Sequence, residues 1–289
     1  MTDTQVFALD GGLSTALESQ GLVIDGAMWT GELLLTNPEA VTVAHRSFVD
    51  AGSDIIITGS YQLSFEGGRR VGWTDDDVER ALRHSTTAAR LAANDDTLVA
   101  ASIGPFGAHL NDGSEFRGNY GVADSVIRDF HDRRLDILLE TEPDLLALET
   151  MPDLAEVRVL LELIESKSAD MPFWVSFTVS EPGIISGGGT FAEACALVEG
   201  YANAMAVGIN CSPLSVITPT LSGIETDLPF IVYPNAGQTW DSDAMDWVGE
   251  PRFATELHIQ EWVKLGARMV GGCCGYGPVD IRRFHAKRV

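Results

Sequence analysis

Three of the four cysteines lie where apolar segments end, and thiolates placed there can hold a metal ion. Cys211 ends the run AVGINC, and the adjacent Cys273 and Cys274 follow the run RMVGG. Three thiolates that converge on one point suit Zn²⁺ in tetrahedral coordination. Neighbouring strand residues point to opposite faces, so the pair can share an ion only where the backbone leaves β geometry. The glycines around the pair permit that departure: Gly271, Gly272 and Gly275.

The pattern supplies no fourth ligand for such an ion. Cys195 falls inside a helical segment, FAEACALV, and no histidine ends an apolar run. Three protein ligands with an open position are typical of a catalytic zinc site. A zinc ion with three thiolates is electron-rich, so it is a poor activator of water but a suitable holder for a substrate thiolate. A sulfur held in this way can attack a positively charged sulfonium methyl group, whose leaving group departs neutral.

Two carboxylates also follow apolar runs and suggest an amino-acid substrate. Asp10 ends QVFALD and Glu149 lies in LLALET. Together they would bind an ammonium group, while the N–H groups of Gly11 and Gly12 would bind the carboxylate. A loop cap for Asp10 and an ion pair for Glu149 are the structural alternatives. Asn235 and Tyr276 are further candidates for substrate contacts, and an aromatic wall could hold the sulfonium through cation–π contacts: Tyr61, Phe106, Tyr120 and Tyr276.

These residues need a scaffold that brings distant strand ends together. Strands are predicted at 5–10, 54–60, 98–105, 145–150, 173–179, 206–211, 229–237 and 268–275. Helices are predicted at 38–52, 75–94, 123–142, 154–166, 191–203, 214–226, 253–267 and 278–289. Strands that are apolar on both faces are typical of a parallel sheet covered on both sides. Eight such units predict an α/β fold, a (β/α)8 TIM barrel forming a single domain over residues 1–289, with active residues at the strand ends. An open doubly wound sheet is the alternative.

Composition narrows the classes of partner. The chain has 289 residues, 45% hydrophobic and 21% charged, which are ordinary values for a globular protein. Its 19 basic and 42 acidic residues give a net charge of −23, which argues against nucleic acid and membrane surfaces as partners. No apolar stretch approaches the ~18 residues of a transmembrane helix. The N-terminus MTDTQVFALDGG does not resemble a signal peptide, and four cysteines are no disulfide framework, so we expect a cytoplasmic protein.

Several segments together resemble the zinc-dependent homocysteine S-methyltransferases, a TIM-barrel family, over nearly the whole length. The specific signal is GINC followed by GGCC, and the supporting segments are LDGGLSTALESQG, AGSDIIITGSYQ, SIGPFGAHLNDGSEFRGNYG, LLALETMPDLAEV and YPNAGQTWD. The resemblance implies that Cys211, Cys273 and Cys274 bind Zn²⁺. It implies that Asp10 and Glu149 hold homocysteine and that methionine is the product. The chain looks most like the stand-alone type that uses S-methylmethionine or S-adenosylmethionine, without cobalamin.

Two departures from the family pattern lie beside the expected pocket. The family commonly has GGCCGT and YPNSGE, whereas this chain has Tyr276, Ala236 and Gln238 at the differing positions. They leave the metal ligands intact and leave the donor and the acceptor range open. Selenocysteine or another thiol is the alternative acceptor. A non-catalytic zinc or thiol sensor is the alternative of a different class, and a zinc hydrolase fits less well because such enzymes commonly use histidine and carboxylate ligands. The sequence does not specify an oligomeric state.

Overall fold

Eight parallel strands form one sheet whose two edges meet. The computed structural model describes residues 5–24, 26–237, 239–241 and 246–285. The order of strands is β1 (Phe7–Ala8), β12 (Ala267–Val270), β9 (Phe230–Tyr233), β8 (Ala204–Asn210), β5 (Phe173–Phe177), β4 (Leu145–Met151), β3 (Leu98–Ile103) and β2 (Ile55–Ile57). A parallel bridge between Leu9 and Ile55 joins the two edges, next to a 2.8 Å hydrogen bond from Asp54 N to Ala8 O. The predicted (β/α)8 barrel is confirmed, and the open sheet is wrong.

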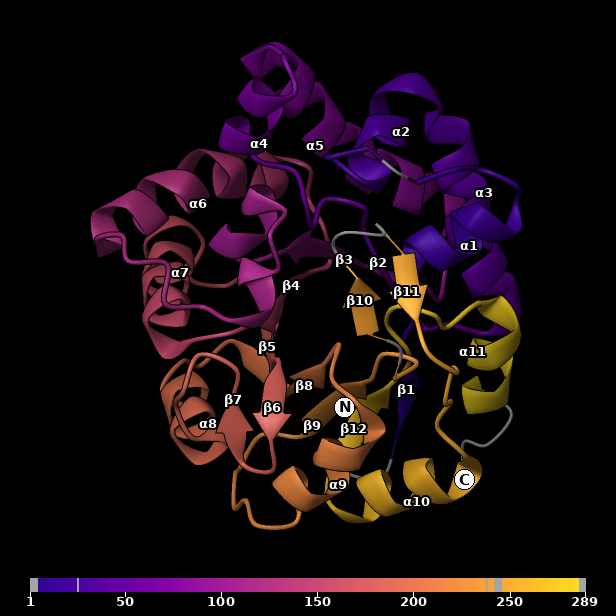
Figure 1. Cartoon of the computed structure of the whole chain (residues 1–289), viewed down its shortest axis with the longest axis vertical. Helices are drawn as coiled ribbons and strands as arrows, with labels where there is room; N and C mark the ends of the chain where they lie inside the picture. The colour runs from indigo at the N-terminus through magenta and orange to yellow at the C-terminus, as the bar shows by residue number, and fades with distance from the viewer. Residues whose placement is uncertain (1–4, 25, 238, 242–245, 286–289) are drawn as a thin grey trace.

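Helices surround the strands, as Figure 1 shows. The helices that connect successive barrel strands or follow the last one are α3 (Pro38–Ala51), α5 (Asp75–Ala92), α6 (Asp124–Glu140), α7 (Leu154–Lys167), α8 (Phe191–Glu199), α9 (Leu214–Leu221), α10 (Glu256–Lys264) and α11 (Pro278–His285). Capping residues fix where several of these helices begin. Thr74 and Thr190 form capping boxes at α5 and α8, and the Asp153 side chain accepts a hydrogen bond from Glu156 N at the start of α7. None of the helices in the described part of the chain combines the length and apolar character needed to span a membrane.

The loops contain short helices and hairpins that were not predicted from the sequence. They are α1 (Leu13–Ser19), α2 (Thr30–Thr36), α4 (Phe65–Arg70), the 3-10 helices η1 (Phe106–Leu110) and η2 (Ser114–Phe116), and the hairpins β6 (Val179–Glu181)–β7 (Ile184–Ile185) and β10 (Thr239–Asp241)–β11 (Asp246–Val248). Most of them follow the carboxyl end of a barrel strand. In a TIM barrel this is the end that carries the active site, so these loops are placed to shape it.

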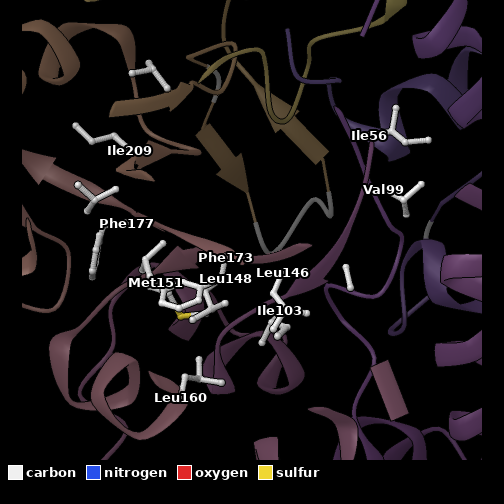
Figure 2. Packing of buried hydrophobic residues seen from close by; sticks show 14 of the residues in the cluster. Ile56, Val99, Ile103, Leu146, Leu148, Met151, Leu160, Phe173, Phe177 and Ile209 are labelled. Carbon is white, nitrogen blue, oxygen red and sulfur yellow. The ribbon is translucent and has the colours of Figure 1, made fainter. Parts of the chain in front are cut away.

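The core has two layers, and strand alternation decides which layer each side chain enters. Leu146 and Leu148 of β4 belong to the cluster between strands and helices, where Figure 2 shows them near Met151, Phe173 and Leu160. Their neighbours Leu145 and Ala147 belong to the second cluster, inside the barrel. Full burial of each such leucine is worth about 1.5–3 kcal/mol. The same alternation continues to Glu149, which therefore lies on the inward side of β4 at its carboxyl end.

Candidate active site

A cavity of about 180 Å³ lies at the carboxyl ends of the barrel strands. Its lining comes from β2, β4 and β9 and from the segments that follow β1, β2, β3, β8 and β12. It brings together seven of the residues predicted from the sequence: Asp10, Gly11, Gly12, Glu149, Cys211, Cys273 and Cys274. The strand ends of a closed barrel meet at one rim, which is why residues so distant in the chain share one cavity.

The three predicted thiol ligands converge. The Sγ atoms of Cys211 and Cys274 are 3.6 Å apart, and those of Cys273 and Cys274 are 3.9 Å apart. Zn–S bonds of about 2.3 Å at tetrahedral angles place two sulfurs about 3.8 Å apart, so both separations fit a shared ion. The Cys211–Cys273 separation is shorter, 2.8 Å, and needs a small outward movement. Within the described residues, this is the only group of three or more cysteine, histidine or carboxylate side chains close enough to hold a metal ion.

The backbone around the cysteine pair leaves β geometry, as predicted. Strand β12 ends at Val270, and Cys273 N then donates to Pro234 O (2.8 Å) while Cys274 O accepts from Ala236 N (2.9 Å). Gly275 has φ +85°, which favours glycine. A Cβ on Gly272 would lie 2.2 Å from Cγ of Tyr276, so no larger residue fits there. The glycines thus allow both thiols to face one point.

Cys211 is held by a strained backbone and by one neighbouring amide. Its φ is +46°, an uncommon value for a residue with a side chain. Asn235 Nδ2 donates to Cys211 O (3.0 Å), and Asn235 Oδ1 accepts from Gly237 N (2.9 Å). Asn235 is not among the residues that line the cavity. The structure therefore places it as a support of Cys211 and not, as predicted, against a substrate.

Glu149 is a buried carboxylate with hydroxyl partners. Ser102 Oγ donates to its Oε1, and the Tyr233 hydroxyl donates to Oε2 at 3.3 Å. Tyr233 is itself held by Trp174 Nε1, which donates to its hydroxyl at 3.1 Å. Burial raises the pKa of Glu149 to about 7. The partners of the Glu149 carboxylate are hydroxyl groups and not cations, so the predicted alternative of an ion pair for Glu149 is not seen among the described residues.

Asp10 lies beside Glu149 at the base of the cavity. Its Oδ2 accepts from Ile57 N at 2.8 Å. Burial raises the pKa of Asp10 well above its usual value, and the negative charge of Glu149 adds to this. The described residues that line the cavity include no lysine, arginine or histidine. A ligand with a positive charge would supply the missing partner of both carboxylates.

Two predicted substrate contacts differ from the structure. The Gly12 N–H donates to Tyr276 O (2.9 Å), so it is not available to a substrate carboxylate. Tyr276 is fully buried, is not among the residues that line the cavity, and its hydroxyl accepts from Ala254 N at 2.7 Å. It packs against Phe253 and Phe284. The turn at Gly275 places the tyrosine in the packing behind the site.

The sequence reasoning missed several lining residues. Tyr61 lines the cavity as predicted, but Phe106 and Tyr120 do not, whereas the unpredicted Trp29 and Phe116 do. Glu115 also lines it, and burial raises its pKa to about 7. Ser102 and Tyr233 could have been predicted from the sequence. They occupy inward-facing positions, two residues apart from other inward residues, on strands that the sequence does predict. Gln238 lies outside the described residues, and Ala236 is buried next to the cysteine turn.

Comparisons with known proteins agree on one family. The family model described as homocysteine S-methyltransferase matches residues 7–287. Homocysteine S-methyltransferase 3 of Zea mays is 35% identical over 96% of this chain and 88% of its own length. Selenocysteine Se-methyltransferase of Brassica oleracea var. italica is 33% identical over 97% of this chain and 88% of its own length. The metallated form of the homocysteine methyltransferase MmuM from Escherichia coli superposes with a TM-score of 0.87, at 33% identity, over 98% of this chain and 96% of that one.

Proposed function

Because the chain belongs to the homocysteine S-methyltransferase family, we propose that it moves a methyl group from a sulfonium donor to the sulfur of homocysteine, giving methionine. The observation that carries this proposal is the convergence of three thiols on one face of a cavity that also holds two buried carboxylates. The donor we propose is S-methylmethionine or S-adenosylmethionine. Both are cations, and the lining described here is rich in negative groups and contains no basic side chain.

We propose Zn²⁺ as the metal and Cys211, Cys273 and Cys274 as its ligands. The sulfur separations of 3.6 and 3.9 Å fit tetrahedral coordination. An all-thiolate donor set favours zinc over magnesium or calcium, which prefer oxygen ligands. When bound with one position open, zinc would lower the pKa of the acceptor thiol, which is about 8.5 in the free state.

Asp10 and Glu149 would orient the acceptor by binding its ammonium group. The two carboxylates interact electrostatically, since the charge of Glu149 acts on the pKa of Asp10. An ammonium group between them would favour the charged form of both. The hydroxyl groups of Ser102 and Tyr233 fix the Glu149 carboxylate, so it is preorganised before the substrate arrives.

The transfer itself is a displacement at carbon. The acceptor sulfur forms a bond to the methyl carbon while the bond from that carbon to the sulfonium sulfur breaks. The electron pair of the broken bond stays with the donor sulfur, which leaves as a neutral thioether, and the thiol proton of homocysteine is released. The chain contributes by placing the two sulfurs in line within one water-poor cavity, and proximity of this kind supplies most of the rate.

The test combines metal analysis with a donor screen. Purified protein is expected to hold one zinc ion per chain, and the spectrum of the cobalt-substituted protein is expected to shift when homocysteine is added. Homocysteine is then incubated with S-methylmethionine, S-adenosylmethionine or betaine, and methionine is quantified. Zinc without turnover by any donor would favour a non-catalytic zinc or thiol sensor over the proposed enzyme.

A selenol acceptor is the second candidate, because relatives from Brassica oleracea var. italica and Astragalus bisulcatus named as selenocysteine methyltransferases are each 33% identical to this chain. Selenocysteine in place of homocysteine in the same assay separates the two acceptors. We also propose that residues 1–289 act as one domain. A reducing compartment such as the cytoplasm is the setting we propose, since the site requires free thiols.

A further inference from the structure

One acidic residue of the cavity has no part in the function proposed above. Glu115 lies on η2, in the loop after β3, whereas Asp10 lies just after β1 and Glu149 lies near the carboxyl end of β4. It lines the same cavity as the three cysteines. Its Oε2 atom is buried without a hydrogen-bond partner. A buried carboxylate oxygen that lacks a partner is costly, so its presence in a ligand cavity calls for a ligand group that satisfies it.

The nearest cation does not satisfy this carboxylate. Arg117 follows two residues later, but its Nη1 donates to Asp112 O (2.9 Å) and its Nη2 donates to Ser114 Oγ (3.2 Å). Its ion pair is with Asp112, at 3.6 Å. Arg117 and Asp112 are both exposed. The charge of Arg117 lowers the pKa of Glu115 from a distance, but no hydrogen bond or ion pair among the described residues joins the two side chains. A cationic group in the cavity can therefore pair with this carboxylate directly.

The loop holds Glu115 in place through a close backbone approach. A Cβ on Gly107 would lie 2.6 Å from Glu115 N, so the contact between η1 and η2 requires glycine there. Ser114, next to Glu115, is buried and its N–H donates to Asp112 Oδ1 at 2.9 Å. Glu115 is thus presented by a packed turn and not by a free loop tip.

Glu115 lies near a proposed zinc ligand, Cys274, toward which the methyl group of the donor must point. The negative charge of Cys274 acts on Glu115, and that of Glu115 acts on Tyr61, so the three groups are neighbours. Trp29, Tyr61 and Phe116 line the same space, and aromatic faces attract cations. The other carboxylate pair, Asp10 and Glu149, is already assigned to the acceptor's ammonium group.

We propose that Glu115 binds the positive charge of the methyl donor and makes the site selective for cationic donors. This inference rests on the proposed methyl transfer. Since no basic side chain is found among the described lining residues, the donor's carboxylate has no ionic partner, and its cationic centre is the group that is recognised. The charge also matters for the reaction, because the donor loses its positive charge on giving up the methyl group. Product release is then favoured by the loss of this attraction.

The experiment compares Glu115→Gln and Glu115→Asp with Asp95→Asn, an exposed acid in the turn before β3 that does not line the cavity. Steady-state kinetics are measured with homocysteine and S-methylmethionine both varied. Glu115→Gln is expected to raise the KM for the donor about tenfold, which is the effect of losing one partly desolvated contact to a cation. The KM for homocysteine should stay within about twofold of the parent value. Glu115→Asp should retain most of the donor affinity, and Asp95→Asn should behave as the parent.

A second readout does not depend on turnover. Trimethylsulfonium ion, which carries the charge without the amino-acid part, is titrated calorimetrically into the zinc-loaded parent and the variants. Glu115→Gln should weaken its binding by the same factor as the donor KM. Unchanged donor KM and trimethylsulfonium affinity would overturn the proposal, as would an equal rise in both substrate KM values. If the parent methylates no acceptor but binds trimethylsulfonium in a Glu115-dependent manner, the proposed function fails while the cation site stands.

Discussion

The Sγ atoms of Cys211 and Cys273 lie 2.8 Å apart, although 62 positions separate the two residues in the chain. This is longer than a disulfide bond of about 2.05 Å and shorter than the ~3.8 Å between two thiolates on one zinc ion. The two thiols therefore lie where a small movement of either side chain admits a shared ion. The strand order, with β8 and β12 on either side of β9, brings these two strand ends together.

Cys211→Ala is expected to abolish zinc retention and methyl transfer while the fold is kept. Two thiolates alone do not hold zinc tightly, since catalytic sites use three protein ligands. Metal content by mass spectrometry, activity and circular dichroism are the measurements. Cys195→Ala is the matched control, because Cys195 is buried in α8 and belongs neither to the cysteine group nor to the cavity lining. Full activity in the Cys211 variant would rule out the proposed site.

Glu149→Gln is expected to raise the KM for homocysteine about 30-fold, on the order of 2 kcal/mol for the loss of one partner of a buried charge pair. Zinc content should be unchanged, since Glu149 is bonded to Ser102 and Tyr233 and not to the cysteines. Bisubstrate kinetics and metal analysis test this. Glu162→Gln, an exposed glutamate of α7, is the control. Loss of metal in the Glu149 variant would show that its role is wrongly assigned.

The affinity for an acceptor analogue should rise with pH. Burial raises the pKa of Glu149 to about 7, so below that pH the group is neutral and binds an ammonium group weakly. Norvaline reports on this step alone, because it has the ammonium group but no thiol that titrates. Its affinity should increase about tenfold per pH unit below 7 and level off above it. In Glu149→Gln the step near pH 7 should disappear, and a step of unchanged size would contradict the assignment.

Asn235→Ala tests the support of a proposed metal ligand. The side chain donates to Cys211 O, at a backbone with φ +46°. Loss of such a supporting contact commonly weakens metal binding by about 10–100-fold. Chelator competition measures the zinc affinity, and the homocysteine KM at saturating zinc should change little. Asn37→Ala removes a comparable side chain-to-backbone bond at the start of α3 and should leave the zinc affinity unchanged. A large rise in the homocysteine KM with an unchanged zinc affinity would show that Asn235 contacts the substrate, as the sequence predicts.

Tyr276→Phe should affect stability and not substrate affinity. The hydroxyl accepts from Ala254 N, and loss of this hydrogen bond costs about 1 kcal/mol. For a chain of this size that corresponds to a fall in Tm of about 2–4 °C. Thermal unfolding and both KM values are the measurements. A rise in either KM with an unchanged Tm would show that Tyr276 contacts a substrate after all.

The sequence predicts the barrel well because its signal is repeated in every strand and helix. Short elements are less predictable: α4 has six residues and α2 has seven, and helices of this length depend on tertiary contacts rather than on their own propensity. The cysteine pair was predicted to share a face because glycines bracket it. The direction of Tyr276 could not be predicted, since it follows from one left-handed turn at Gly275.

The position of Glu115 in the site could not be predicted from the sequence either. Its position in a polar loop between Gly113 and Arg117 resembles that of any solvated surface acid. Only the close contact of η1 with η2, which Gly107 permits, brings it to the cavity. In contrast, Asp10 lies just after β1 and Glu149 lies near the carboxyl end of β4, so their place at the rim follows from the fold.

The bridge between Leu9 and Ile55 and the hydrogen bond from Gly272 N to Asp10 O tie the first strand to the second and to the turn after the last. Asp10 and the thiol pair thus come from segments far apart in the sequence. During synthesis, a chain still attached to the ribosome cannot assemble the cavity until the segment carrying Cys274 has emerged. A nascent chain without that segment therefore cannot hold the proposed metal ion.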